Sequence, residues 1–159
     1  MQSRKRRSNP PAKSAYASAL TLLARRPHSI AELRMKLMRR GYSAEELGGT
    51  VERLTASGYL DDQAFAAGLV RRRQQSRGSF AIGAELAAKG IAREVAGQAL
   101  EQLDLGSEID AALHLTSRLG SPVDPRVLAR KLAGRGFSAQ VVWQVVRMRH
   151  EADLEPDSA

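Results

Sequence analysis

Residues 32–47 read ELRMKLMRRGYSAEEL, and two later segments carry the same chemistry: GAELAAKGIAREV begins at position 83 and LARKLAGRGFSAQVV at position 128. The segments align on three glycines, Gly41, Gly90 and Gly136, with offsets of 49 and 46 residues. A base precedes each glycine and a large apolar residue follows it. This triplet is typical of a helix C-terminus, because glycine takes the left-handed conformation freely and the cation complements the helix dipole.

The register extends beyond the glycines in both directions. Leu37, Leu86 and Leu132 lie four residues before their glycines, on one helical face with Leu33, Ile82 and Leu128. Leucines also recur 21 residues before each glycine, and an apolar residue recurs ten after it. Each unit is therefore predicted to hold three helices. The expected helices span 14–26, 29–40, 44–56, 62–75, 79–89, 92–103, 108–119, 125–134 and 139–150.

The repeat predicts an all-α protein of three tandem three-helix units. We expect units at 14–60, 61–106 and 107–150, a disordered basic tail at 1–13 and an acidic C-terminal tail at 151–159. Units of about 47 residues bury too little surface to be stable alone, so neighbours should stack into an elongated, curved array. Chance similarity between amphipathic helices is the alternative, and three coincident glycine triplets weigh against it.

Composition and charge indicate a class of partner. Aromatic residues make up only 4% of the chain and hydrophobic residues 43%, which favours a helical core of aliphatic side chains. Net charge is +8, and the basic N-terminal and acidic C-terminal tails nearly cancel, so most of this charge lies on the body. A basic body predicts an acidic partner such as nucleic acid or a filament on it. With no cysteine, signal peptide or membrane span in the sequence, we expect a cytoplasmic protein.

Three stretches give the chain a resemblance to a known family: ARRPHSIAELRMKL at 24–37, GYLDDQAFA at 58–66 and RGFS at 135–138. They resemble RecX, the bacterial regulatory family that modulates the RecA recombinase, over roughly residues 14–150. The chain departs from the family pattern at Ile91, where an aromatic residue is usual, and in its basic extension before Lys13. The resemblance implies a protein that binds the RecA filament on single-stranded DNA and inhibits its recombinase, ATPase and coprotease activities. We expect this protein to act as a monomer.

Clustered basic residues are the candidate contacts with that partner. The richest group is at the end of the fourth expected helix, and helix-dipole complementation with solubility is its alternative explanation. We favour, beyond this group, bases near the glycine boundaries, because equivalent positions in a repeat array tend to form one ridge. The candidate partner-binding residues are Arg25, Arg26, Arg40, Arg71, Arg72, Arg73, Arg77, Lys89, Arg130, Lys131 and Arg135.

Other polar and aromatic residues are given structural roles. Asp61 and Asp62 are predicted to cap a helix and to mark a unit boundary, and not to bind metal. Tyr59, Phe65, Phe137 and Trp143 are expected in the core or between units. No catalytic residue, metal site or cofactor is predicted, because the three histidines are isolated and no nucleophile or phosphate-binding motif occurs. A protein that competes directly for nucleic acid, or a general helical-repeat scaffold, remains an alternative function.

Overall fold

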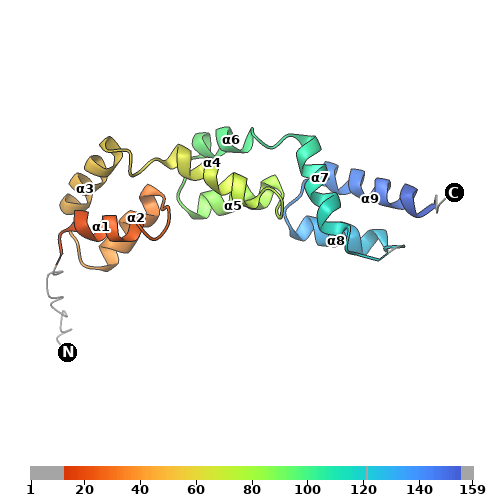
Figure 1. The fold of residues 1–159 in the computed structure, drawn as a ribbon, viewed down its shortest axis with the longest axis horizontal. Helices are drawn as coiled ribbons and strands as arrows, with labels where there is room; N and C mark the ends of the chain where they lie inside the picture. The colour runs from red at the N-terminus through yellow and green to blue at the C-terminus, as the bar shows by residue number, and fades with distance from the viewer. Residues whose placement is uncertain (1–12, 121, 155–159) are drawn as a thin grey trace, which may run out of the picture. The chain divides into compact units, whose positions relative to one another are not determined.

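The computed structural model describes residues 13–120 and 122–154, and within them the chain is all-α, with nine helices and no strand (Figure 1). The all-α part of the fold prediction is thus confirmed. The charged run at residues 4–7 and the acids at 155 and 157 lie outside the described residues. By contacts, the chain divides into two compact units, residues 1–65 with 89–91, and residues 66–88 with 92–159.

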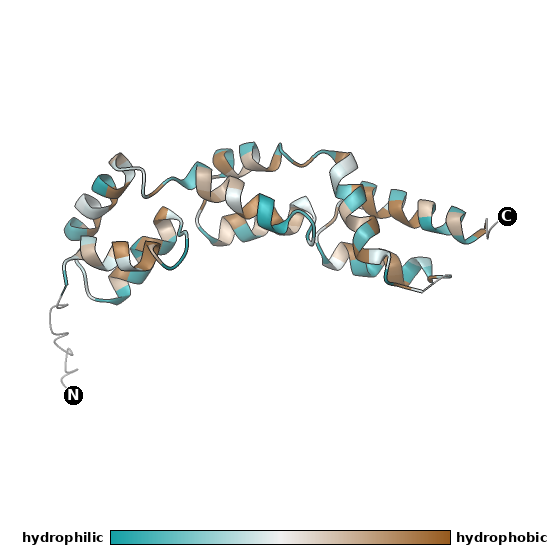
Figure 2. Ribbon diagram, viewed as in Figure 1, coloured by the Kyte–Doolittle hydropathy of each residue, from teal (hydrophilic) through white to brown (hydrophobic). Residues whose placement is uncertain are grey.

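Unit 1 contains α1 (Ala15–Leu23), α2 (Ile30–Arg39) and α3 (Ala44–Ala56), each packed on the other two. Its core is built from the predicted leucine face, and Leu33 and Leu37 of α2 are fully buried with Leu54 of α3. Burial of each such side chain contributes roughly 1.5–3 kcal/mol. Figure 2 shows apolar and polar residues mixed along these helices, as amphipathic packing requires.

Helix α2 ends in the way the glycine triplet predicts. Gly41 has a φ of 94°, the Gly41 N–H donates to the Met38 carbonyl, and the Tyr42 N–H donates to the Leu37 carbonyl. These two bonds form a Schellman cap and place the buried Tyr42 ring against the core. At the start of α3, Ser43 and Glu46 form the predicted capping box.

Unit 2 continues from α4 (Asp62–Arg73), whose first four residues belong to unit 1, through α5 (Ser79–Ala88) and α6 (Arg93–Leu100). It ends with α7 (Leu105–Thr116), α8 (Pro125–Gly134) and α9 (Ala139–Leu154). Helix α5 packs on α6, while α7 and α8 both pack on α9. The core under α9 includes Leu128 and Leu132 of α8, as the leucine register predicts.

Most predicted helix bounds agree with the structure within about one turn, and α7 is the clearest correction. It was expected at 108–119 and runs from Leu105 to Thr116, because the Asp104 side chain accepts the Ser107 N–H and caps the helix one turn earlier. The predicted unit boundary at 106/107 therefore falls inside α7. Helices α1, α4 and α6 end a few residues earlier than expected, and α9 ends four later.

Two of the four aromatic predictions are wrong. Phe65 and Phe137 are buried, as expected, but Tyr59 is 60% exposed and Trp143 is 61% exposed. Tyr59 follows the helix-ending Gly58, and the next residue, Leu60, takes the core position instead. Trp143 lies on the outer face of α9, whose buried positions are Val141 and Val145.

Candidate basic interface

The predicted basic residues fall into two groups, according to whether they have a partner within the chain. Arg26 and Lys89 converge on Glu32, Arg73 pairs with Glu85, and Arg135 donates to the Ser76 carbonyl. The others are exposed and make no side-chain hydrogen bond or ion pair with any described residue; they are Arg25, Arg40, Arg71, Arg72, Arg77, Arg130 and Lys131.

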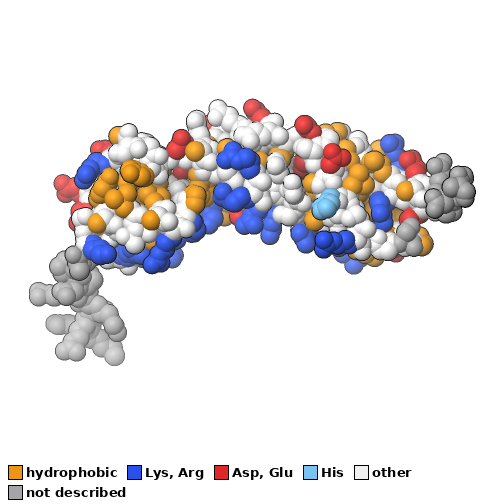
Figure 3. Space-filling model, viewed as in Figure 1, with side chains coloured by type: hydrophobic (Ala, Val, Ile, Leu, Met, Phe, Trp, Pro, Cys, Tyr) orange, Lys and Arg blue, Asp and Glu red, His pale blue; other side chains and the backbone are white. Residues whose placement is uncertain are grey.

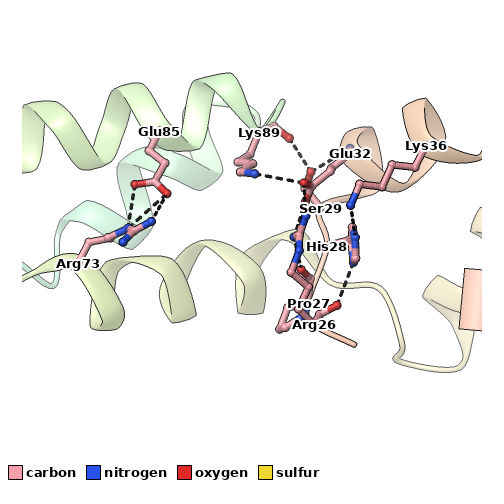
Figure 4. A network of polar contacts seen from close by, with 9 residues as sticks. All are labelled: Arg26, Pro27, His28, Ser29, Glu32, Lys36, Arg73, Glu85 and Lys89. Atoms are coloured by element: carbon pink, nitrogen blue, oxygen red, sulfur yellow. Dashed lines mark hydrogen bonds and ion pairs between the residues drawn. The ribbon is translucent and has the colours of Figure 1, made fainter. Parts of the chain in front are cut away.

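Glu32 organises the first group of cations, within unit 1 (Figure 4). Arg26 donates to the Glu32 carboxylate from both terminal nitrogens, from Nη2 to Oε1 at 2.7 Å and from Nη1 to Oε2 at 3.0 Å. Lys89 Nζ lies 3.1 Å from Glu32 Oε1. The bond from Arg26, followed by that from Lys89, lowers the pKa of Glu32 to about 2. The same bond raises the pKa of Arg26. Arg26 and Lys89 therefore hold the fold together as well as carrying charge.

His28 lies beside this network and is neutral by virtue of its contacts. Its Nδ1 is 2.9 Å from the Arg26 carbonyl and therefore donates, while its Nε2 is 2.8 Å from Lys36 Nζ and accepts. Burial lowers the pKa of this imidazole, and the nearby cations act in the same direction. His28 thus fixes the chain between α1 and α2 and has no catalytic arrangement.

The same junction recurs in unit 2 with different residues. In unit 1, the Ile30 N–H at the start of α2 donates to the Asp62 carboxylate, and Ser29 donates to the Lys89 carbonyl. In unit 2, the Ser79 N–H at the start of α5 donates to the buried Glu108 carboxylate at 2.7 Å, and the Gly78 N–H donates to the Arg135 carbonyl. Both carboxylates lie 28 residues before a helix-ending glycine, and both N–H groups lie 11 before one.

Asp61 and Asp62, at the first predicted unit boundary, therefore have different roles. Asp61 accepts the Gln63 and Ala64 N–H groups and is the helix cap, as predicted. Asp62 instead binds the start of α2, a role that sequence reasoning missed. The acid at the matching register position, Glu108, was a signal that could have revealed it.

The junction in unit 2 gathers cations that are distant in sequence. Arg135 Nη1 lies 3.3 Å from the Ser76 carbonyl, so the C-terminal end of α8 lies beside the chain that follows α4. That chain carries Arg77, and Arg71 and Arg72 are in the last turn of α4. We call Arg71, Arg72, Arg77 and Arg135 the basic cluster. Figure 3 shows Lys and Arg side chains over this part of unit 2 and over α8.

Arg73 lies on the same turn as the basic cluster but does not belong to it. Its guanidinium binds Glu85 of α5 through Nε and Nη2, at 3.0 and 2.9 Å (Figure 4), and this bond raises its pKa. Arg73 thus ties α4 to α5. The adjacent Arg71 and Arg72 keep their charge available to solvent, because consecutive residues point in different directions around a helix.

In residues 13–120 and 122–154, no group of three His, Cys, Asp or Glu side chains could hold a metal ion. No helix in those ranges combines the length and apolarity that crossing a bilayer requires.

Comparisons with known proteins agree with this architecture. A family model described as the first three-helix domain of RecX matches residues 15–54, and one for the second three-helix domain matches residues 61–100. A protein named Regulatory protein RecX from Leptothrix cholodnii is 38% identical over 152 residues, covering 92% of this chain and 96% of that protein. Its namesake from Trichlorobacter lovleyi is 35% identical over 150 residues, covering 87% and 96%.

A solved structure shows the same fold. The crystal structure of RecX from Lactobacillus salivarius superimposes with a TM-score of 0.78 at 18% identity, covering 86% of this chain and 95% of that one. At this identity the likeness speaks for the fold, while the two family models and the curated relatives decide the family. On that evidence, the chain belongs to the RecX family.

Proposed function

We propose that this chain is a non-catalytic cytoplasmic regulator that binds the RecA filament on single-stranded DNA and inhibits its recombinase, ATPase and coprotease activities. Membership of a family whose curated relatives are named regulatory proteins supports the regulatory role. The same family resemblance supports RecA as the partner, and a monomer is proposed as the acting form.

The observation that carries the proposal is the basic cluster of unit 2. Arg71, Arg72 and Arg77 are exposed and have no ionic partner among the described residues, although the rest of residues 14–150 holds 13 acids beside 17 bases. Arginines presented in this way attract a polyanionic surface and form charge-assisted bonds with phosphate or carboxylate. A filament on DNA supplies both kinds of acceptor.

The organisation that presents this cluster is proposed to be three stacked units, at 14–60, 61–106 and 107–150. Its support is the repeated junction, in which a carboxylate and a backbone N–H occupy the same register positions twice. Gly41, Gly90 and Gly136 also share a positive φ, between 72° and 94°. The remaining predicted cations, Arg25, Arg40, Arg130 and Lys131, are proposed to extend the contact surface.

The proposal is tested by DNA-dependent ATP hydrolysis. RecA is assembled on single-stranded DNA and titrated with this protein, and we expect inhibition below equimolar ratio. Replacing both Arg71 and Arg72 by Glu should raise the half-inhibitory concentration about tenfold, equivalent to about 1.4 kcal/mol. The matched control replaces Arg93 and Arg118, two exposed arginines of unit 2 outside the basic cluster, by Glu.

Both variants change the net charge equally, so a difference in inhibition between them cannot come from non-specific electrostatic attraction. Inhibition that weakens equally in the two variants would show that overall charge, and not the basic cluster, makes the contact. Absence of any inhibition by the wild-type protein at equimolar ratio would refute the function itself. Circular dichroism melting of each variant verifies that the fold is kept.

Direct competition for nucleic acid is the second candidate function, and the exposed arginines also suit it. In that case the protein should bind a single-stranded oligonucleotide without RecA, and the logarithm of affinity should fall linearly with the logarithm of salt concentration. Binding to RecA in the absence of DNA would favour the first function. A general scaffold would show preference for neither.

A further inference from the structure

An apolar hollow lies between α8 and α9 of unit 2. Its volume is about 550 Å³, and its walls are side chains of both helices and of the turn between them. They include Ala129, Ala133, Phe137, Val142, Trp143 and Val146. The three α9 residues among them share one helical face, because they lie at spacings of one, three and four.

Trp143 is the unusual member of this lining. It is the only tryptophan of the chain, and 61% of it is exposed. The exposed indole leaves a large apolar area in contact with water. Tryptophan is also enriched at the energetic centres of protein interfaces. Ala129 and Ala133 opposite it are small, so the hollow keeps room for a side chain from outside.

The rim of the hollow is cationic. Arg130 lines its α8 side and is exposed. On the α9 side, the Arg147 guanidinium lies 4.9 Å from the centroid of the Trp143 ring. Arg147 also contacts Glu151 at 3.6 Å, but both side chains are more than half exposed, so this pair is weak and screened by water.

We propose that this hollow is a docking site for an apolar side chain, such as Leu or Phe, carried by an acidic segment of a protein partner. The apolar walls take the side chain, and Arg130 and Arg147 pair with flanking carboxylates. The site deepens the proposed function by giving the partner a second contact, distinct from the basic cluster.

Other occupants fit the hollow less well. The five residues that follow α9 read EPDSA and contain no large apolar side chain. A second copy docking by the same face would bring like-charged rims together, which is unfavourable. A nucleobase could stack on Trp143, but the alanine and valine walls offer no hydrogen-bond partners for its polar edge, and burying that edge unpaired is costly.

A peptide experiment tests the site without reference to RecA. The probe is a synthetic helical peptide without tryptophan, carrying Leu and Phe on one face between Asp and Glu residues. Trp143 fluorescence then reports only on this chain. We expect the acidic peptide to shift the emission and to protect Trp143 from acrylamide, and a peptide with Lys in place of each acid to do neither. An unprotected Trp143, or equal protection by both peptides, would overturn the proposal.

A second experiment tests whether the hollow contributes to binding of the RecA filament. Trp143→Ala should weaken binding to the RecA filament about thirtyfold or more, the range of an interface hot spot. Ala133→Leu keeps Trp143 but fills the hollow from an exposed position, so it should weaken binding similarly. Phe80→Ala is the matched control, because Phe80 is 69% exposed in the same unit and does not line the hollow.

The outcomes separate the two proposals. If wild-type protein fails to bind the filament, the proposed function falls and the peptide experiment alone decides the site. If wild-type protein binds and all three variants bind equally well, the docking proposal is wrong while the function stands. If Trp143→Ala abolishes binding of a bare oligothymidylate instead, the hollow takes nucleic acid and the acidic-segment proposal is overturned.

Discussion

Gly90→Ala tests the junction of unit 1 quantitatively. Gly90 has a φ of 72°, a conformation in which an L-residue with a Cβ costs about 1 kcal/mol. A Cβ built at this position would also lie only 2.5 Å from the Cβ of Ala31, at the start of α2. Since carbon atoms pack at roughly 3.5–4.0 Å, the two backbones must move apart by about 1 Å, and overpacking of this kind costs about 1–3 kcal/mol.

The total expected loss is therefore about 2–4 kcal/mol, compared with the 1 kcal/mol that the conformation alone would give. The chain supplies its own control in Gly58→Ala. Gly58 has a nearly equal φ of 74°, but its added Cβ would meet no atom within 4 Å. The difference between the two variants isolates the contact with Ala31.

Urea unfolding followed by far-ultraviolet circular dichroism measures both losses. The double variant Ala31→Gly with Gly90→Ala should recover the steric part, giving a coupling free energy of about 1–3 kcal/mol in the double-mutant cycle. Equal destabilisation by Gly90→Ala and Gly58→Ala, with no coupling to Ala31, would refute the close approach on which the described junction depends.

Two further changes test the polar contacts. Glu32→Gln should remove a pH-dependent part of the stability, because the pKa of Glu32 is about 2 in the folded chain against an ordinary 4.5. The stability of the wild-type protein should fall by on the order of 2 kcal/mol as the pH drops from about 5 to 2, allowing for solvent screening at the half-exposed Arg26, and the variant should change less. Identical pH profiles of the two proteins in thermal melts would contradict the ion-pair network. Glu108→Ala should lower the free energy of unfolding by about 1–3 kcal/mol, because it leaves the Ser79 N–H unpaired. The control Asp110→Ala, which removes an exposed acid of the same helix, should lower it by less than about 0.5 kcal/mol in the same urea titration. Equal losses would mean that Glu108 has no special role.

Local signals were sufficient to predict the helices. Gly41 and Gly136 end helices with the bonds that their flanking residues require, and Ser43 with Glu46 forms the predicted box. These features depend on residues within one turn of each other, so the sequence contains all the information needed. Even α7 fits this view, since Asp104 is a good cap that competes with later starting points.

Pairing and exposure were harder to predict, because they depend on residues far apart in sequence. Nothing near Lys89 indicates that its partner is Glu32, 57 residues away, or that Arg73 rather than Arg72 faces Glu85. The repeat position of Trp143 predicts a place in the core or between units, yet Val141 and Val145 occupy the buried face of α9. The predicted binding residues therefore include cations that stabilise the fold.

The two register positions of the junction are not filled in the same way throughout the described chain. The carboxylate position is filled by Asp62 and Glu108, but the matching position 28 residues before Gly41 is Lys13, which cannot accept an N–H bond. The donor position is filled by Ile30 and Ser79, but 11 residues before Gly136 it is Pro125, which has no N–H. Asp124 caps this helix by accepting the Arg126 N–H instead. Lys13 and Pro125 therefore cannot supply the acceptor and the donor of a junction of this kind, which occurs at the two pairings that the structure shows.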